Sequence, residues 1–148
     1  MKRKQSCYYY IKEELDKHKD DKIRELIISN EKYVKYGNLA LWCMGKYGKR
    51  MAEYLDWCGI EVSYYVDGKA IDNKNEVYHV TSSECLSGFC GLIIITTADE
   101  QFQNQVKRRV NDDLCDDCEI ITLDDLGEMA YEESINAEMK CLERSTGG

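Results

Sequence analysis

Apolar residues recur along the chain with two different periods, which indicates that helices alternate with buried strands. In residues 8–29 they fall mostly three or four positions apart among many charges, which predicts an amphipathic helix. Its apolar positions are Ile11, Leu15, Ile23, Leu26 and Ile27. A shorter helix over Glu31 to Tyr36 is expected to end at Gly37 and Asn38, a pair suited to a helix C-cap and a turn.

Beyond residue 38 the apolar residues form short continuous runs, typical of parallel strands covered on both faces. Strands are predicted over Leu39–Cys43, Val62–Val66, Val77–Val80, Leu92–Thr96 and Glu119–Leu123. Helical spacing returns in a helix that ends near Gly59, at Tyr47, Met51, Leu55 and Cys58, and again at Phe102, Val106 and Val110. A loop is expected over 69–76 and a turn or short helix over 81–86. A capping-box pattern at Thr122 to Asp125 predicts a C-terminal helix to about Cys141.

Strands that alternate with helices through short connections require right-handed crossovers and a parallel sheet with helices on both faces. The chain is therefore predicted to form one α/β domain, a Rossmann-like sheet of strand order 3-2-1-4-5 over residues 38–148. Residues 1–37 would form an N-terminal helical extension. In such sheets a ligand binds at the carboxyl ends of the strands where the winding reverses, here between the first and fourth strands.

That switch point carries the most informative motif, Cys43-Met44-Gly45-Lys46-Tyr47-Gly48, which matches the dinucleotide fingerprint G-x-G-x-x-G at its second and third glycines. Gly45 would let backbone amides approach a phosphate, and Gly48 would let the helix pack close to the sheet. Asp67, at the end of the second strand, would accept hydrogen bonds from ribose hydroxyls. Thr96 ends the strand across the switch point and completes the candidate set.

Two features of this turn weigh on the interpretation. Cys43 stands where the pattern has the glycine of the tight turn, so a wider or tilted loop is expected. The alternative is that Gly45 and Gly48 serve only a tight connection between strand and helix, since many sheets of this kind hold no dinucleotide.

The segment from Asn38 to Leu123 resembles bacterial Rossmann-like domains found beside sugar-modifying transferases, including sugar acyltransferases, glycosyltransferases and methyltransferases. The resemblance is carried by the turn at 45–49, by Tyr64-Tyr65-Val66-Asp67, and by the later strands at 77–81 and 92–96. It implies that Gly45, Lys46, Tyr47 and Asp67 lie near NAD(P) or a nucleotide-sugar. Hexapeptide repeats and a transferase domain are missing here, so an accessory or sensing module is expected rather than a complete enzyme.

Charge and hydropathy narrow the classes of partner. The formal net charge is −8, which argues against a nucleic-acid partner because such affinity comes mostly from cations that neutralise phosphates. No apolar run approaches the roughly 20 residues of a membrane span. The basic N-terminus lacks the apolar region of a signal peptide, so a cytoplasmic location is expected.

The chain has eight cysteines, which in a reducing compartment are expected to be free thiols. Cys115 and Cys118 have the spacing of a metal knuckle, and Cys85 and Cys90 could complete a four-thiolate zinc site. Buried thiols that serve only packing are the favoured alternative. His18 and His79 lie in different segments with no serine elbow, so no catalytic triad is predicted.

Two hypotheses of function follow from the sequence. In the first, the chain is a nucleotide-binding module for NAD(P) or a nucleotide-sugar, with the N-terminal helix available as a homodimer contact. In the second, it is a Rossmann-shaped interaction or scaffold domain that has lost ligand binding, as the replacement of a fingerprint glycine by Cys43 would allow.

Overall fold

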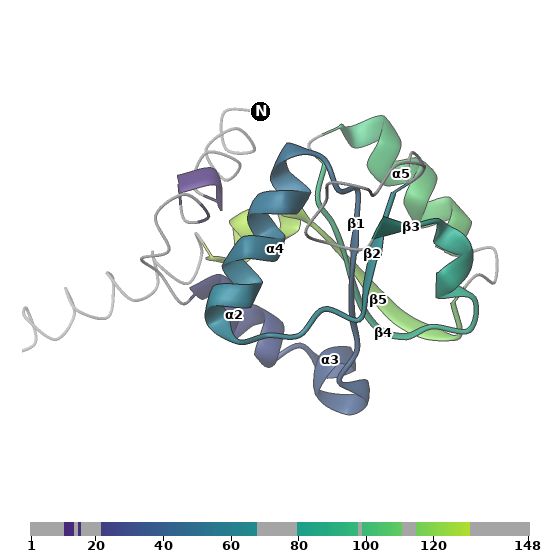
Figure 1. Ribbon diagram of the computed structural model, residues 1–148, viewed down its shortest axis with the longest axis horizontal. Coiled ribbons are helices and arrows are strands. Elements are labelled where there is room, and N and C mark those ends of the chain that lie inside the picture. Colours follow the sequence, from purple (N-terminus) through teal and green to yellow (C-terminus); the bar gives the residue numbers. More distant parts are fainter. Residues whose placement is uncertain are drawn as a thin grey trace, which may run out of the picture.

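The fold is seen in a computed structural model of the 148-residue chain, which describes residues 11–13, 15, 22–67, 80–97, 99–110 and 115–130. Helices and strands alternate along it (Figure 1). In chain order they are α2 (Lys22–Ile28), α3 (Glu31–Tyr36), β1 (Leu39–Trp42), α4 (Lys46–Cys58), β2 (Tyr64–Val66), β3 (Val80–Thr81), the 3-10 helix η1 (Ser83–Leu86), β4 (Cys90–Ile95), α5 (Glu100–Arg109) and β5 (Asp117–Thr122). Residues 11–13, 15 and 123–130 are also helical.

The five strands form one parallel sheet of order β3-β2-β1-β4-β5, which confirms the predicted α/β class and strand order. In the register, Trp42 of β1 lies beside Val66 of β2 and Ile95 of β4, so the carboxyl ends of these three strands are level. The chain leaves β1 for α4 on one face of the sheet and leaves β4 for α5 on the other (Figure 1). The reversal of winding therefore falls between β1 and β4, as predicted.

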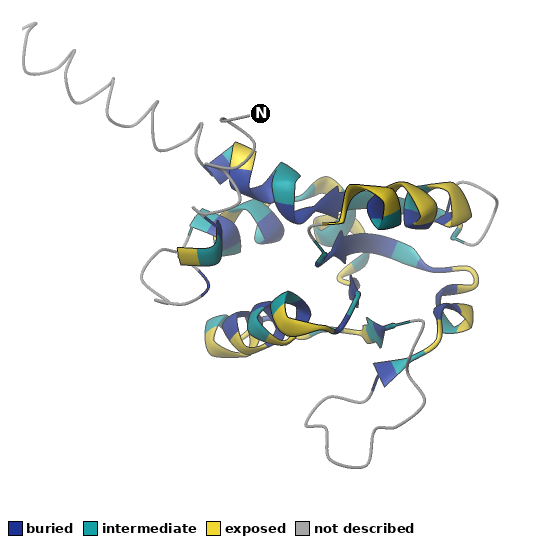
Figure 2. Ribbon diagram, turned by 90° about the horizontal axis from the view of Figure 1, so that it is seen from above, coloured by how far each residue is buried: buried dark blue, intermediate teal, exposed yellow. Residues whose placement is uncertain are grey.

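Two apolar clusters cover the two faces of the sheet, because successive strand residues point to opposite faces. The first joins Leu39 and Leu41 of β1 to buried residues of α2, α4 and the helical stretch 123–130. The second joins Ala40 and Trp42 to η1 and α5. Figure 2 shows the buried sides of the long helices α4 and α5 turned toward the sheet. Ile11 and Leu15 belong to the first cluster, so part of the predicted N-terminal extension packs in the core.

Several predicted boundaries move by one or two residues. β1 ends one residue earlier than predicted, at Trp42, β2 begins at Tyr64 rather than Val62, and β4 begins at Cys90 rather than Leu92. β5 begins at Asp117 and ends at Thr122. Of the predicted helix over 8–29, the described residues 11–13, 15 and 22–28 are helical. His18, His79, the loop over 69–76, most of the strand over 77–80 and the helix beyond residue 130 lie outside the described residues.

The helix ends follow the capping residues in the sequence. Asn30 caps α3 by accepting hydrogen bonds from the backbone amides of Lys32 and Tyr33, at 3.0 and 3.1 Å. Gly37 ends the same helix in the left-handed conformation, with φ of 69°. The predicted capping box is confirmed: the Thr122 amide donates to Asp125 Oδ2 at 3.0 Å and the Asp125 amide donates to Thr122 Oγ1 at 3.1 Å.

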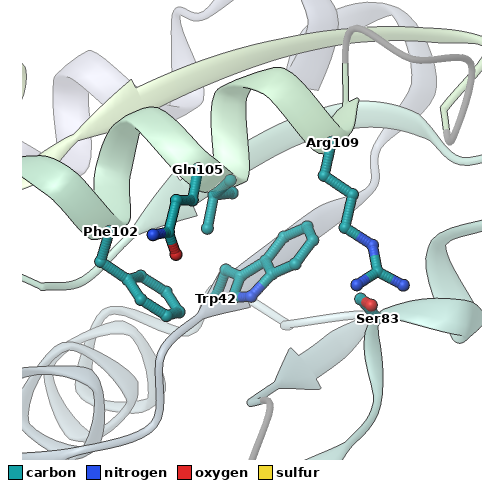
Figure 3. Close-up of a pocket in the computed structure, with 6 residues that line it drawn as sticks. Trp42, Ser83, Phe102, Gln105 and Arg109 are labelled. Carbon is teal, nitrogen blue, oxygen red and sulfur yellow. The ribbon is translucent and has the colours of Figure 1, made fainter.

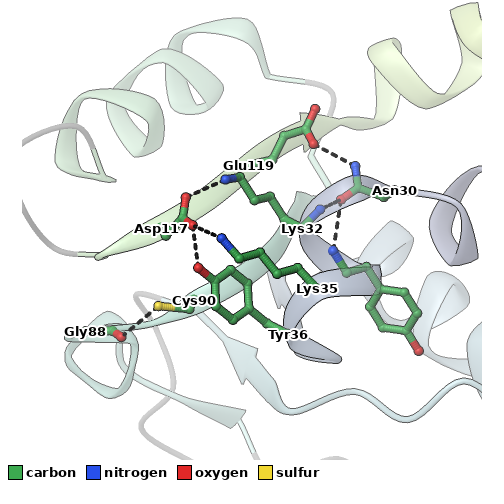
Figure 4. Close-up of polar contacts among 9 residues, drawn as sticks. Asn30, Lys32, Lys35, Tyr36, Gly88, Cys90, Asp117 and Glu119 are labelled. Atoms are coloured by element: carbon green, nitrogen blue, oxygen red, sulfur yellow. Dashed lines mark hydrogen bonds and ion pairs between the residues drawn. The ribbon is translucent and has the colours of Figure 1, made fainter.

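Polar contacts attach α3 to the start of β5 (Figure 4). Lys32 Nζ lies 2.6 Å from Asp117 Oδ1, Lys35 Nζ lies 3.7 Å from Asp117 Oδ2, and the Tyr36 hydroxyl donates to Asp117 Oδ2. Asn30 Nδ2 donates to Glu119 Oε2 at 2.8 Å. These contacts fix α3 below β4 and β5, at the edge of the sheet opposite the switch point.

No helix within the described ranges is both long and apolar enough to cross a bilayer.

Candidate functional site

The turn after β1 begins with an unusual backbone conformation at Cys43. Its φ is 87°, within the left-handed region that favours glycine, and it is the one non-glycine residue with a positive φ among those described. Its amide donates to the Val66 carbonyl at 2.7 Å, which extends the pairing of β1 with β2 by one step. Cys43 thus adopts a backbone conformation that suits glycine, at a cost of roughly 1–2 kcal/mol.

Gly48 allows α4 to pack against the end of β1, as predicted. A Cβ at this position would lie 2.1 Å from the Cys43 carbonyl oxygen and 3.0 Å from Thr96 Oγ1. Both neighbours are held in place, because the Thr96 hydroxyl contacts the Trp42 carbonyl at 3.0 Å and also the Cys43 carbonyl. Thr96 is only 2% exposed, so its side chain joins the ends of β1 and β4 and does not reach the surface.

Gly45 is the N-cap of α4, and its surroundings are open. A Cβ at this position would meet no atom within 4 Å, and Gly45, as a glycine, has no side chain that could cap the amides of the first turn. Gly45 and Lys46 are exposed, whereas Tyr47 is half-buried against the first apolar cluster. The N-terminus of this 13-residue helix therefore opens toward solvent at the carboxyl edge of the sheet.

Asp67 comes directly after β2, and its carboxylate reaches the turn that follows β1. Its Oδ2 accepts a hydrogen bond from the Met44 amide at 2.9 Å, across 23 positions of sequence. The Asp67 amide in turn donates to the Thr81 carbonyl at 3.0 Å, which ties the carboxyl ends of β2 and β3 together. The structure thus brings the predicted acidic residue to the predicted turn, with the carboxylate bonded to a turn amide.

The electrostatics of the turn suppress any thiolate chemistry at Cys43. Burial, with the nearby Asp67 charge as a second cause, raises the pKa of the Cys43 thiol to about 12. Met44, next along the chain, is 6% exposed and packs in the first apolar cluster. Cys43 and Met44 thus build the turn, and the groups presented to solvent are Gly45, Lys46 and the edge of Asp67.

The cysteines of the zinc hypothesis lie near the opposite edge of the sheet. Cys90 begins β4 beside Asp117, and Gly91 pairs with Cys118, so the adjacent strands bring these residues together as the parallel sheet requires. Cys85, Cys90, Cys115 and Cys118 are free thiols. Among the described residues no three His, Cys, Asp or Glu side chains are grouped so that they could hold a metal ion.

Burial governs the chemistry of the cysteine pair that precedes and begins β5. It raises the pKa of Cys115 to about 12, with the Cys118 thiol contributing next, and it also raises the pKa of Cys118. Both side chains pack against the second apolar cluster. A raised pKa and contact with apolar side chains are properties of thiols that serve packing, the alternative that the sequence favours.

A second feature, given no role by the sequence, is a pocket of about 210 Å³ between η1 and α5 (Figure 3). It is lined by Trp42, Ser83, Phe102, Gln105, Val106 and Arg109. These residues come from three separate segments. The periodicity of α5 marked Phe102 and Val106 as an inward face, but only the folded sheet places them over Trp42.

Comparisons of the chain with models of protein families, with curated proteins and with solved structures found no match. The assignment of a function therefore depends on the geometry of the chain itself.

Proposed function

We propose that this chain is a nucleotide-binding module that holds a phosphate group of NAD(P) or a nucleotide-sugar at the N-terminus of α4. The observation that carries the proposal is the convergence of Asp67 with the N-terminus of α4, which has a glycine as its N-cap. The Asp67 carboxylate lies 2.9 Å from the Met44 amide, one residue before Gly45. A ribose hydroxyl acceptor and a phosphate-binding helix end thus stand side by side.

The charges of α4 support an anionic ligand. The first residues of the helix are Lys46, Tyr47, Gly48, Lys49 and Arg50, and the first turn contains no acidic residue. Helices ordinarily favour acidic residues at this end because the macrodipole places partial positive charge there. Cations at a helix N-terminus are unfavourable alone and become favourable when a phosphate binds between them and the amides.

The hydrogen bond to Met44 constrains how a ribose would bind. An ionised carboxylate has about four acceptor sites, and the Met44 amide uses one of those on Asp67. A ribose hydroxyl can therefore donate to the same carboxylate without breaking the bond to Met44. Asp67 would therefore orient the sugar and brace the turn at once. Its negative charge also favours a ligand that brings hydroxyl donors beside its phosphate over a free phosphate ion.

The test is isothermal titration of the full chain with AMP, NAD, a UDP-sugar and inorganic pyrophosphate. The decisive variant is Gly45→Asp, because the new side chain has room and aspartate is a good N-cap. The added carboxylate would occupy the amides and repel a phosphate. We expect thermal stability equal to or above that of the wild type, with affinity for the nucleotide reduced about tenfold or more.

Gly45→Ala is the matched control, since it adds a Cβ in the same open space without a charge. It should retain nucleotide binding. If no nucleotide bound to the folded wild type at about 10 mM, or if Gly45→Asp bound as tightly as Gly45→Ala, the proposal would be wrong.

The scaffold hypothesis is the second candidate, and three observations favour it. The Met44 amide already has an acceptor in Asp67, and Thr96 is buried rather than presented to a ligand. Large apolar side chains also lie exposed on separate elements, with Val34 68% and Trp57 58% exposed. The titrations decide between the two candidates, because a scaffold would bind none of the nucleotides.

A further inference from the structure

The pocket between η1 and α5 combines a buried apolar floor with a polar rim. Trp42 and Val106 are 4% and 3% exposed and form its base, with the Phe102 ring at one end (Figure 3). The rim carries the exposed Gln105 and Arg109. The Arg109 side chain runs beside the Trp42 indole, and its guanidinium points toward Ser83. Such a concave apolar surface with a few convergent polar groups is the usual form of a small-molecule site.

The polar groups of this rim are not used by the fold. Among the described residues, neither the Arg109 guanidinium nor the Ser83 hydroxyl makes a side-chain hydrogen bond or an ion pair. Arg109 is also the last of three consecutive cations, after Lys107 and Arg108, in a chain of net charge −8. Of the residues that line the pocket, Arg109 alone carries a charge.

We propose that this pocket binds a small aromatic carboxylate. The ring would lie against Trp42, Phe102 and Val106, and the carboxylate would accept hydrogen bonds from the Arg109 guanidinium and the Ser83 hydroxyl. Arginine suits this role because its planar fork matches a carboxylate with two parallel hydrogen bonds. The Gln105 amide on the same rim would contact a polar substituent of the ring.

The size of the pocket restricts the ligand. About 210 Å³ is below the roughly 300 Å³ at which pockets for drug-sized ligands begin, so a single ring with a short acidic arm is the upper limit. Aromatic rings pack against tryptophan and phenylalanine in offset or edge-to-face arrangements, which adds to the gain from burial. A ring therefore uses the floor better than a short aliphatic acid.

This site is independent of the proposed nucleotide site. Trp42 faces the second apolar cluster with α5, whereas Met44 and the helix α4 belong to the first cluster on the other face. Neither Gly45 nor Asp67 lines the pocket. Failure of nucleotide binding would therefore leave the carboxylate site standing, and the reverse is also true.

Intrinsic fluorescence offers a direct test, because the chain has two tryptophans and Trp57 is 58% exposed. In a Trp57→Phe background, with excitation at wavelengths that the eleven tyrosines do not absorb, the remaining emission reports Trp42 alone. Titration of this protein with phenylacetate should change the Trp42 emission saturably, with a Kd of about 1 mM or tighter. Phenylacetamide, the neutral analogue, should bind about tenfold more weakly or not at all.

Arg109→Gln in the same background should weaken phenylacetate binding about tenfold, whereas Arg108→Gln, which removes the same charge from the neighbouring exposed position, should leave it within about twofold. Both side chains are exposed, and circular dichroism of each variant verifies that it is folded. Absence of saturable binding at about 10 mM, equal binding of the amide, or equal effects of the two substitutions would overturn the proposal.

Discussion

The Asp67 carboxylate accepts a hydrogen bond from the Met44 amide at 2.9 Å, so the end of β2 braces the turn that follows β1. This contact gives Asp67 a structural role in addition to the ribose contact proposed for it. The two roles have different chemical requirements. Bracing needs an acceptor oxygen of the right length, whereas selection of a ribose gains from the full charge of the carboxylate.

The substitution Asp67→Asn separates these roles. The asparagine Oδ1 can still accept from Met44, so we expect the free energy of unfolding to change by no more than about 1 kcal/mol. The proposed site should favour the tightest-binding ribonucleotide over its dideoxy analogue by about tenfold, and the variant should lose most of that preference. Calorimetric titration of the wild type and of Asp67→Asn with the ribonucleotide and with its dideoxy analogue measures this preference. An unchanged preference would remove Asp67 from the ribose site.

Gly48 and Gly45 should differ in how far the same substitution destabilises the protein. In Gly48→Ala the new Cβ would lie 2.1 Å from the Cys43 carbonyl oxygen. The Cβ is fixed to the backbone of α4 and the oxygen belongs to the backbone of the turn, so the helix must shift away from the sheet. We expect a loss of about 1–3 kcal/mol in urea unfolding, despite the helix propensity of alanine. Gly45→Ala meets no atom within 4 Å and should change the stability by less than about 1 kcal/mol. Equal effects at the two sites would contradict the close packing of α4.

Cys43 allows a test of its backbone conformation. Alanine and glycine both remove the buried thiol, so a comparison of Cys43→Ala with Cys43→Gly cancels most of the packing loss. At a φ of 87° the glycine protein should be the more stable by about 1 kcal/mol, against the usual order in which alanine stabilises by restricting the unfolded chain. Thermal unfolding of the two variants side by side measures the difference. A more stable alanine variant would mean that the turn relaxes out of the left-handed region.

The order of the sheet was predictable from the sequence because it depends on local patterns. Continuous apolar runs such as 92–95 mark strands buried on both faces, and the right-handed crossover rule then leaves few arrangements. The helix caps were predictable for the same reason. Gly37 and the pair of Thr122 with Asp125 bond to groups that lie only three or four residues away in the sequence. The close packing at Gly48 also follows from its place between a strand and a helix.

The parts that the sequence did not reveal depend on contacts between distant segments. The hydrogen bond between Asp67 and the Met44 amide depends on the register of β1 with β2, which places Trp42 beside Val66. The spacing of residues in the sequence does not determine this register. Thr96 was expected beside the ligand because it ends the predicted strand over 92–96, but its hydroxyl turns inward to the carbonyls of Trp42 and Cys43. The pocket over Trp42 requires that η1 and α5 stand apart on one face, a property of side-chain volumes in three segments.

The attachment of α3 to β5 predicts a dependence of stability on pH. Hydrogen bonds from Lys32 first, and then from Tyr36, lower the pKa of Asp117 from 3.8 to about 2. Because the folded protein holds the ionised carboxylate more favourably than the unfolded chain does, the contact stabilises the fold above about pH 4. This contribution should decline as the pH falls from about 4 to about 2, where the folded state also takes up the proton.

The measurement is urea unfolding of the wild type and of Asp117→Asn at several pH values. At about pH 7 the wild type should be the more stable, and the difference should shrink as the pH falls toward about 2. Added salt should also reduce it, since the ion pair is partly exposed. Asp116→Asn, a change of the same kind at an exposed neighbour, controls for the loss of one negative charge. A stability difference between wild type and Asp117→Asn that stayed constant down to about pH 2 would mean that the ionisation of Asp117 does not stabilise the attachment of α3.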